Sequence, residues 1–514
     1  MSGLQPLPPA RLAPEQAGEG AYDWRRMHPV TPLLKGWKIV VAVMAIAFAQ
    51  AGDDIAQAAE LLDGKGWLVA LGGLVAIAVI GVLWSLVSWR ATRFAVTDEA
   101  VHLRQGVVFK QQRQARLDRL QAVDMVQPLL ARLVGLAELR LEVAGGQNSR
   151  VSLSFLREAE ATALRAELLA LAAGIRRPQV PAAAQGPGGD PSDPAQAVAA
   201  ADGAPAASSG PAPLGVPAFE TAPERVVYEV PMPRLIGSIV RSTSLLWIVA
   251  GVVGLAVALT AGAPAEVMFS VIPAMFALVS WLWTRLNTGA TFRAATSPDG
   301  IRLRHGLTEA RSQTVPPGRI QAVRMVRPLL WSRKDWWYVQ VNIAGYAGDN
   351  RNQASETVLH PVATRAEAMT ALWLVLPDLG VDDPVAAIDA GLDGFGEDGG
   401  YTAAPPSSRW VDPIGWRRHG VLVTRQALLV RSGRLRRSFV VVPHERTQSL
   451  GLEQGPLQRK FGLASVVAHS TPGPVAPRVE HLDQHVAARL LDEQAARARH
   501  ARREAGPEQW MRDR

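Results

Sequence analysis

The strongest chemical candidate in the sequence is a run of arginines toward its C-terminal end. Seven of them fall within 21 residues: Arg417, Arg418, Arg425, Arg431, Arg434, Arg436 and Arg437. A guanidinium offers a planar fork of donors that matches the oxygens of a phosphate. Because four of these arginines surround a predicted turn at Gly433, the segment is a candidate site for an anionic phospholipid headgroup or a partner protein. The alternative is a hairpin face whose charges are merely solvated.

The distribution of charge draws attention to the same region. The 514 residues include 54 Lys and Arg against 46 Asp and Glu, a formal net charge of +8. Residues 409–514 alone hold 19 basic and 10 acidic residues, so nearly all of the excess lies there. We therefore expect an anionic partner at this end of the chain. Nucleic acid is not the expected partner, because only Trp510 stands near the arginines of the tail and no series of stacking aromatics interleaves them.

Other kinds of chemistry find little support. The chain has no Cys, which excludes disulfides, Cys-ligated metal centres and thiol nucleophiles. His481 and His485 are spaced to share a helix face, but no third ligand accompanies them, so no metal is expected. A G-x-G-x-x-G over 394–399 lies among acidic residues that would repel a pyrophosphate. No nucleophile elbow, phosphate-binding loop or paired-carboxylate signature is present, and we predict a non-enzymatic protein without a cofactor.

An internal repeat organises most of the chain. An Arg-x-Gln motif follows a Gly by the same interval three times, as Arg119 and Gln121, Arg319 and Gln321, and Arg446 and Gln448. The same position after each Gln is occupied by Gly135, Asp335 or Gly462. One hypothesis is a binding site used three times, but a register kept in copies of different charge favours a structural role in closing a turn.

Each copy combines strand patterns with one closing helix. Apolar and polar residues alternate before the Arg-x-Gln motif, as in Val101–Arg104, and the alternation ends at a Gly. Helix-like stretches close the copies at 156–173, 364–376 and 479–498. Strands followed by one helix in a unit of this size predict a small barrel or bent sheet capped by that helix.

Four apolar stretches approach the length of a membrane span, about 20 residues. They cover Gly36–Gly52, Gly66–Val87, Ser244–Ala263 and Val267–Trp283, and form two predicted hairpins. Lys and Arg flank the outer ends of both hairpins, whereas only Lys65 lies in a connecting turn. By the positive-inside rule, both termini and all large segments between hairpins are expected on the cytoplasmic side.

The layout resembles a family of bacterial membrane proteins with PH-like domains, the YdbS/YdbT type, whose larger members carry helix pairs and three such domains. The resemblance rests on Arg119-Leu120-Gln121 and its two counterparts, on Pro-Leu elements after them, and on the Gly-Leu-Ala at 135–137 and 462–464. It covers about residues 24–495 and implies a split barrel of antiparallel strands with a C-terminal helix. It implies no particular reaction.

The fold class predicted from the sequence is an α+β membrane protein with two transmembrane helical hairpins and three PH-like split β-barrels, each closed by a C-terminal helix. This fold divides the chain into nine predicted segments. They are a cytoplasmic N-terminal segment (1–35), hairpin 1 (36–89), PH-like domain 1 (90–175), a flexible Ala/Pro/Gly linker (176–233), hairpin 2 (234–285), PH-like domain 2 (286–380), an acidic Gly-rich linker (381–408), PH-like domain 3 (409–496) and a basic tail (497–514).

The function predicted from the sequence is that of a non-enzymatic integral protein of the bacterial cytoplasmic membrane. Its PH-like domains are expected to bind a partner protein or anionic lipid at the inner leaflet. The expected partners are anionic phospholipid, a smaller PH-like membrane protein or further copies of the chain. The competing interpretations are a transporter, an unrecognised membrane enzyme, or a membrane-anchored nucleic-acid binder acting through residues 409–514.

Overall fold

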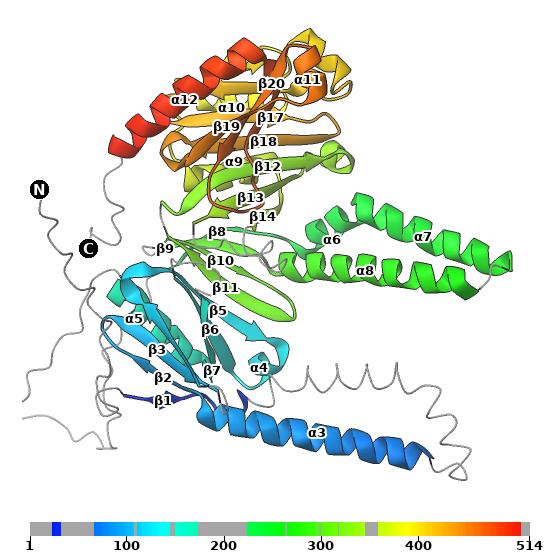
Figure 1. Ribbon diagram of the computed structural model, residues 1–514, viewed down its shortest axis with the longest axis vertical. Coiled ribbons are helices and arrows are strands. Elements are labelled where there is room, and N and C mark those ends of the chain that lie inside the picture. Colours follow the sequence, from blue (N-terminus) through cyan, green and yellow to red (C-terminus); the bar gives the residue numbers. More distant parts are fainter. Residues whose placement is uncertain are drawn as a thin grey trace, which may run out of the picture.

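A computed structural model describes residues 23–31, 66–106, 110–143, 150–172, 224–262, 265–297, 300–316, 318–344 and 358–504. The three copies of the repeat follow one another along the long axis of the molecule, with copy 1 at the bottom and copy 3 at the top of Figure 1. Each described copy contains two groups of antiparallel strands and ends in one helix. The predicted order of strands and then a closing helix is therefore present three times.

Copy 1 begins with a short strand that was not predicted from the sequence, and its other elements follow the predicted order. The elements are β1 (Arg25–Arg26), α3 (Gly66–Ala91), β2 (Arg93–Val96), β3 (Ala100–Gln105), β4 (Gln111–Arg116), η1 (Leu117–Arg119), β5 (Leu120–Pro128), α4 (Leu129–Leu133), β6 (Leu136–Val143), β7 (Arg150–Arg157) and α5 (Glu158–Ala172).

Copy 2 repeats this order around a longer helical insertion. Its elements are β8 (Arg225–Glu229), α6 (Met232–Val240), α7 (Thr243–Thr260), α8 (Ala265–Gly289), β9 (Arg293–Ser297), β10 (Gly300–His305), β11 (Glu309–Val315), β12 (Ile320–Pro328), η3 (Leu329–Lys334), β13 (Trp337–Ile343), β14 (Val358–Ala363) and α9 (Arg365–Val375).

Copy 3 has only short 3-10 turns where copy 2 has its helical insertion. After α10 (Pro384–Leu392) and η5 (Asp398–Gly400) come β15 (Thr402–Ala403), η6 (Pro406–Trp410), η7 (Trp416–Arg418), β16 (Gly420–Val423), β17 (Ala427–Ser432), β18 (Arg436–Pro443), η8 (His444–Arg446), β19 (Ser449–Glu453), α11 (Pro456–Lys460), β20 (Leu463–His469), β21 (Arg478–Asp483) and α12 (Gln484–Glu504).

The register of the repeat is explained by backbone conformation. Gly135 and Gly462 lie just before β6 and β20 with φ of 65°, and Asp335 lies before β13 with φ of 48°. All three are in the left-handed region, which glycine enters without strain and Asp tolerates better than most residues. The position is therefore held by a turn that every copy needs, and Asp335 replaces glycine without changing that turn.

The copies are joined by their sheets, which the sequence did not predict. The second half of copy 1 and the first half of copy 2 form one seven-stranded sheet, ordered β7-β6-β5-β11-β10-β9-β8. Copies 2 and 3 are joined in the same way, in the order β14-β13-β12-β18-β17-β16-β15. Separate barrels were expected, but each half-sheet instead continues into the neighbouring copy through the β5–β11 and β12–β18 pairs.

The predicted transmembrane hairpins are wrong, and the fold class is corrected to an α+β fold with PH-like domains. No single helix in the described part of the chain is long and apolar enough to cross a membrane, although α6 and Thr243–Ala258 pass the same test together with a bend of 56° between them. The bend at Arg241–Ser242 separates α6 from α7, and Pro273 removes a hydrogen bond within α8. The predicted span 36–52 lies outside the described residues.

The predicted acidic linker over 381–408 is also corrected, because much of it is folded. Asp383 caps α10 by accepting a hydrogen bond from the backbone N–H of Ala386 (2.9 Å), and Leu392 at the end of the helix is fully buried. Tyr401 is buried too and donates its hydroxyl to the carbonyl oxygen of Ala387 (3.1 Å). Among the glycines that indicated a linker, Gly396, Gly399 and Gly400 have positive φ and serve turns in this packed segment. Most of the Ala/Pro/Gly linker predicted over 176–233 lies outside the described residues.

Candidate functional site

The arginine-rich segment of copy 3 forms the β17–β18 hairpin and the 3-10 turn before β16. Gly433 turns the hairpin with φ of 71°, and a Cβ there would lie 2.3 Å from the carbonyl oxygen of Arg436. The turn therefore requires glycine at this position. The seven predicted arginines divide into buried and exposed groups, a division that the sequence did not show.

Arg418 and Arg431 are fully buried and serve the backbone. The Arg418 guanidinium donates to the carbonyl oxygens of Gly391 (2.8 Å) and Leu392 (2.6 Å) at the end of α10, and of Gly394 (2.6 Å) beyond it. Arg431 donates to the carbonyl oxygen of Ala390 (2.8 Å). Cations are favourable where a helix ends in unpaired carbonyls. These two guanidiniums are committed to holding the segment after α10 and do not face solvent.

Arg437 belongs to a charge network at the joint between copies 2 and 3. It lies directly opposite Arg327 in the β12–β18 pair, an arrangement that is repulsive by itself. The carboxylate of Asp393 bonds both guanidiniums and that of Arg365 as well. Burial would raise the pKa of Asp393, but the hydrogen bond from Arg365 and the charges of Arg327, Arg365 and Arg437 lower it below its ordinary value. Asp393 is therefore the anion that stabilises this joint.

The remaining arginines of the segment reach the surface. Arg425 pairs with the exposed Asp382 (3.2 Å), and Arg417 lies over the ring of Trp416 (5.3 Å). Arg434 and Arg436 are exposed at the tip of the β17–β18 hairpin. With the exposed Arg417, which has no described carboxylate partner, these two carry the free positive charge that the sequence assigned to the whole run.

The hairpin tip lies close to an aromatic and cationic region at the base of α8. Arg436 lies opposite Pro328 in the β12–β18 pair, and burial together with the charge of Arg436 lowers the pKa of both Arg285 and Arg324. Arg285 lies over three rings: Trp281 (5.6 Å), Trp331 (5.5 Å) and Tyr338 (5.4 Å). None of the described carboxylates is within ion-pair distance of Arg285. A cation stacked on rings and without a carboxylate retains its capacity to bind an anion.

A cavity of about 460 Å³ opens at this same place. Arg285, Trp281, Trp283 and Tyr338 line one part of it, and Arg311 of β11 lines another. Arg311 is already paired with Glu309 (3.0 Å), so Arg285 is the cation of the cavity that lacks a described acidic partner. The sequence had identified Arg285 only as a flanking charge of an apolar segment. Its stacking on residues of β13 and η3 could not be seen before folding.

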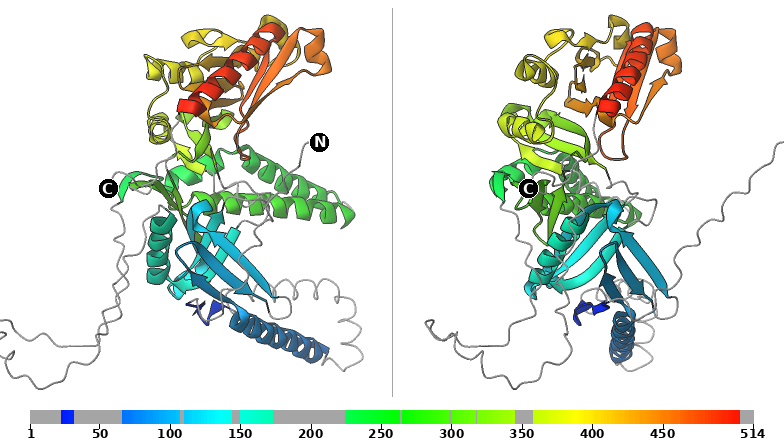
Figure 2. Two further views of the ribbon diagram at one scale, coloured as in Figure 1. Left: turned by 60° about the vertical axis from the view of Figure 1, so that its left-hand side comes forward. Right: turned by 90° about the vertical axis from the view of Figure 1, so that its left-hand side faces the viewer.

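The apolar helices place this cavity beside a large exposed apolar surface. Figures 1 and 2 show α3 and the α7–α8 pair projecting from the same side of the molecule. Exposed apolar side chains run along them, among them Ile80, Trp84, Trp247, Val257 and Phe276. Solvent-exposed apolar surface on this scale marks a contact with protein or lipid. The cavity lies where α8 returns to the body of the protein.

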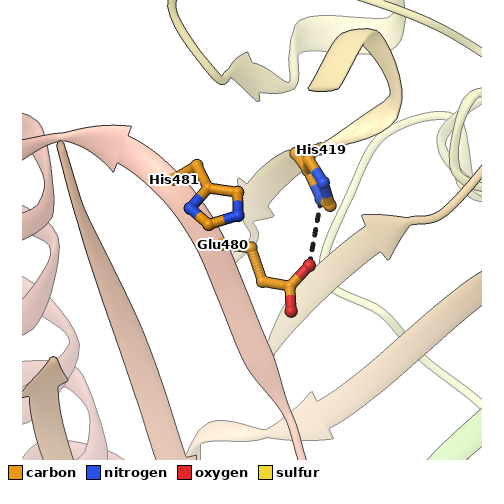
Figure 3. Close-up of side chains that lie close together, drawn as sticks. All are labelled: His419, Glu480 and His481. Carbon is orange, nitrogen blue, oxygen red and sulfur yellow. Dashed lines mark ion pairs between the residues drawn. The ribbon is translucent and has the colours of Figure 1, made fainter. Parts of the chain in front are cut away.

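A second cluster, at His419, ties the two halves of copy 3 together. His419 lies just before β16 and is 2% exposed, whereas Glu480 and His481 lie on β21 (Figure 3). The Nε2 atom of His419 is 2.7 Å from the Asp412 carboxylate, and Nδ1 is 3.4 Å from the Glu480 carboxylate. His481 contacts Gln458 through Nδ1 (2.8 Å).

The donor atoms of His419, Glu480 and His481 lie close enough to share a metal ion. Within the protein, Nε2 of His419 is hydrogen-bonded to the Asp412 carboxylate, whereas its buried Nδ1 lies near the Glu480 carboxylate without a hydrogen bond. The sequence paired His481 with His485, but His485 is absent from the cluster. His419 and Glu480 were missed because they belong to elements 61 residues apart in the chain.

The Arg-x-Gln motifs lie where each second half-sheet begins. In copies 1 and 2 the Gln is a β-bulge residue, because the pairing shifts between Leu120 and Ala122 and between Ile320 and Ala322. The buried Gln321 donates its Nε2 to the carbonyl oxygen of Arg319 (3.4 Å). These positions support a structural role. The positions of the motifs do not require a binding role for the remaining residues, which are Arg119, Gln121, Arg446 and Gln448, and a binding role there stays a prediction.

A family model described as "Bacterial PH domain" matches residues 43–172 and 371–498, together half of the chain. The chain belongs to the bacterial PH domain family. The matched regions cover most of copies 1 and 3, whose half-sheets and closing helices are described above. No curated protein and no solved structure matches the chain.

Proposed function

We propose that this PH domain protein is a non-enzymatic binding protein of the bacterial cytoplasmic membrane, whose domains bind anionic phospholipid or a partner protein at the inner leaflet. PH-like domains suggest a binding role. We further propose that copy 2 is a third PH-like domain and that the chain is of the YdbS/YdbT type. The equivalent order of elements in all three copies supports the first of these statements.

The observation that carries the proposal is Arg285 in the cavity at the base of α8. A guanidinium with no described acidic partner, surrounded by Trp281, Trp283 and Tyr338, combines a phosphate donor with rings that favour the membrane interface. The exposed Arg436 adds a second charge nearby. The proposal requires that apolar surface of α3, α7 and α8 enters lipid, and it does not depend on a transmembrane path.

Vesicle flotation of the full-length protein tests this function. Arg285→Gln combined with Arg436→Gln should weaken binding to vesicles containing phosphatidylglycerol, because each arginine near an anionic surface contributes about 1 kcal/mol. Two such losses correspond to a roughly thirtyfold weaker partitioning. Binding to pure phosphatidylcholine vesicles should be unchanged.

The matched control is Arg425→Gln combined with Arg499→Gln, which removes the same charge from exposed positions away from the cavity. Circular dichroism and thermal melting show whether each variant remains folded. If both double variants are folded and lose vesicle binding equally, the loss is due to net charge, and the cavity is excluded as the headgroup site. Unchanged flotation of the Arg285/Arg436 variant would exclude the proposed headgroup site, and capture of a smaller PH-like membrane protein would then favour the partner-protein alternative.

A further inference from the structure

The joints between copies leave two matching sheet edges at the ends of the molecule. Within a copy, the strand that follows the Gly turn pairs with the preceding copy, and the strand that follows the Arg-x-Gln motif pairs with the next copy. Thus β11 pairs with β5, and β18 pairs with β12. The corresponding strands β4 of copy 1 and β19 of copy 3 end their sheets among the described residues. An unpaired edge carries backbone groups that can pair with another strand.

We propose that β4 of one molecule pairs antiparallel with β19 of a second molecule, so that the chain assembles head to tail through the same joint that connects its copies. The occupant of each edge is a second copy of this chain. This inference is independent of lipid binding, because neither strand contributes to the cavity at α8.

The two internal joints agree on one register. Met125 lies opposite Ser312 at the first joint, and Met325 lies opposite Phe439 at the second. Alignment of the copies by their Gly turns and Arg-x-Gln motifs makes Leu452 the equivalent of the two methionines. By the same alignment, Gln112 is the equivalent of Ser312 and Phe439. Both joints therefore place Gln112 of one molecule opposite Leu452 of the next, with Gln114 opposite Leu450.

The exposed fractions of equivalent side chains indicate that the edge of β19 lacks a neighbouring strand among the described residues. Met325 is fully buried at the joint between copies 2 and 3, whereas Leu452 is 48% exposed. An apolar residue thus occupies this register position in all three copies, but in copy 3 nothing among the described residues covers it. Covering Leu452 would remove its side chain from water, which is favourable in proportion to the apolar area buried.

The side chains of the two edges are also compatible. Arg113 of β4 would lie opposite Gly451, where the absence of a side chain leaves room for the guanidinium. The carboxylate of Glu453 would be diagonal to Arg113 on the same face, within reach of a long side chain. Such an interface is heterologous, since one edge binds the other, and it generates rings or open chains of molecules.

Cysteine cross-linking tests both the contact and its register, because the chain has no Cys. One full-length preparation carries Gln112→Cys, a second carries Leu452→Cys, and they are mixed before treatment with an oxidant or a short bis-maleimide. The mixture should give a cross-linked dimer, whereas either preparation alone should not. As a register control, Glu453→Cys replaces Leu452→Cys and moves the sulfur to the opposite face of the sheet, so the yield should fall at least several-fold.

Sedimentation measurements complete the test. Leu452→Lys should reduce self-association, and Leu457→Lys should not, because Leu457 is similarly exposed at 59% but lies on α11 outside the edge. Thermal melting shows that both variants are folded. A monomeric wild-type chain at all concentrations tested would overturn the proposal. Equal cross-linking in the two registers, or equal effects of the two lysines, would also overturn it.

Discussion

Replacing Arg418 by Met should release the segment that follows α10. The guanidinium is fully buried and donates to three carbonyl oxygens, those of Gly391, Leu392 and Gly394. Methionine keeps most of the apolar contact of the side chain but leaves these acceptors without their donor. Arg417 is the natural control, since it is adjacent and exposed and lies over the ring of Trp416.

The expected cost follows from the number of acceptors. A buried polar group deprived of its partner costs about 1–3 kcal/mol. The sum over three such groups is an upper limit on the free-energy cost of the substitution. The net cost is smaller, because burial of the guanidinium is itself unfavourable and lowers the pKa of Arg418. Water that enters can also satisfy some of these three carbonyl oxygens. We therefore expect the free energy of local opening to fall by about 3 kcal/mol, which corresponds to roughly a hundredfold rise in local opening. Arg417→Met should cost less than about 1 kcal/mol.

Hydrogen exchange with mass spectrometry is the appropriate assay, because it reports local opening in a chain of several units without assuming two-state unfolding. Amides of residues 393–400 should exchange roughly a hundredfold faster in Arg418→Met, while those of copy 1 should not change. Similar exchange in Arg418→Met and Arg417→Met would refute the reasoning, since it would mean that the three carbonyl bonds contribute little.

Two further predictions concern pH and packing. Burial lowers the pKa of His305 and of His360 from the ordinary value of 6.5 to about 4. Both side chains therefore stay neutral in the folded chain between pH 6.5 and about 4, whereas they become protonated in the unfolded chain. The unfolded chain binds more protons in this range, so stability should fall as pH decreases from 6.5 toward 4, by up to about 1.4 kcal/mol per pH unit for each histidine. Denaturant titrations across this range should show a weaker pH dependence after His305→Gln or His360→Gln, and an unchanged slope would contradict the assignment. Gly391→Ala should destabilise copy 3 by about 1–3 kcal/mol, because the new Cβ would lie 2.4 Å from the ring of Phe439. Gly254→Ala, where nothing lies within 4 Å, should be neutral or slightly stabilising by thermal melting.

The joined half-sheets change how the repeat is understood. Each copy is a unit of sequence, but each seven-stranded sheet belongs to two copies. The charge network around Asp393 lies at one such joint and neutralises the opposed Arg327 and Arg437. Neighbouring copies should consequently stabilise one another, in contrast to domains connected only by tethers.

Several features of the candidate site were predictable and others were not. The clustering of arginines around the Gly433 turn followed from spacing, because a tight turn brings its flanking residues together. The fate of each arginine did not follow, since Arg418 and Arg434 have the same chemistry and differ only in what surrounds them. Arg285 was assigned to a helix flank, and two of the three rings near it, Trp331 and Tyr338, come from segments about 50 residues away.

The sequence alone determined the features that depend on local geometry. The threefold register, the left-handed position at Gly135, Asp335 and Gly462, and the closing helices all arise from backbone preferences within a few residues. Tertiary structure decided which strand pairs with which copy, whether an apolar stretch is one straight helix, and which arginines are buried. These outcomes depend on contacts between residues far apart in the chain. A strand edge accepts any partner of suitable register, and a guanidinium is buried only where several carbonyl oxygens converge on it.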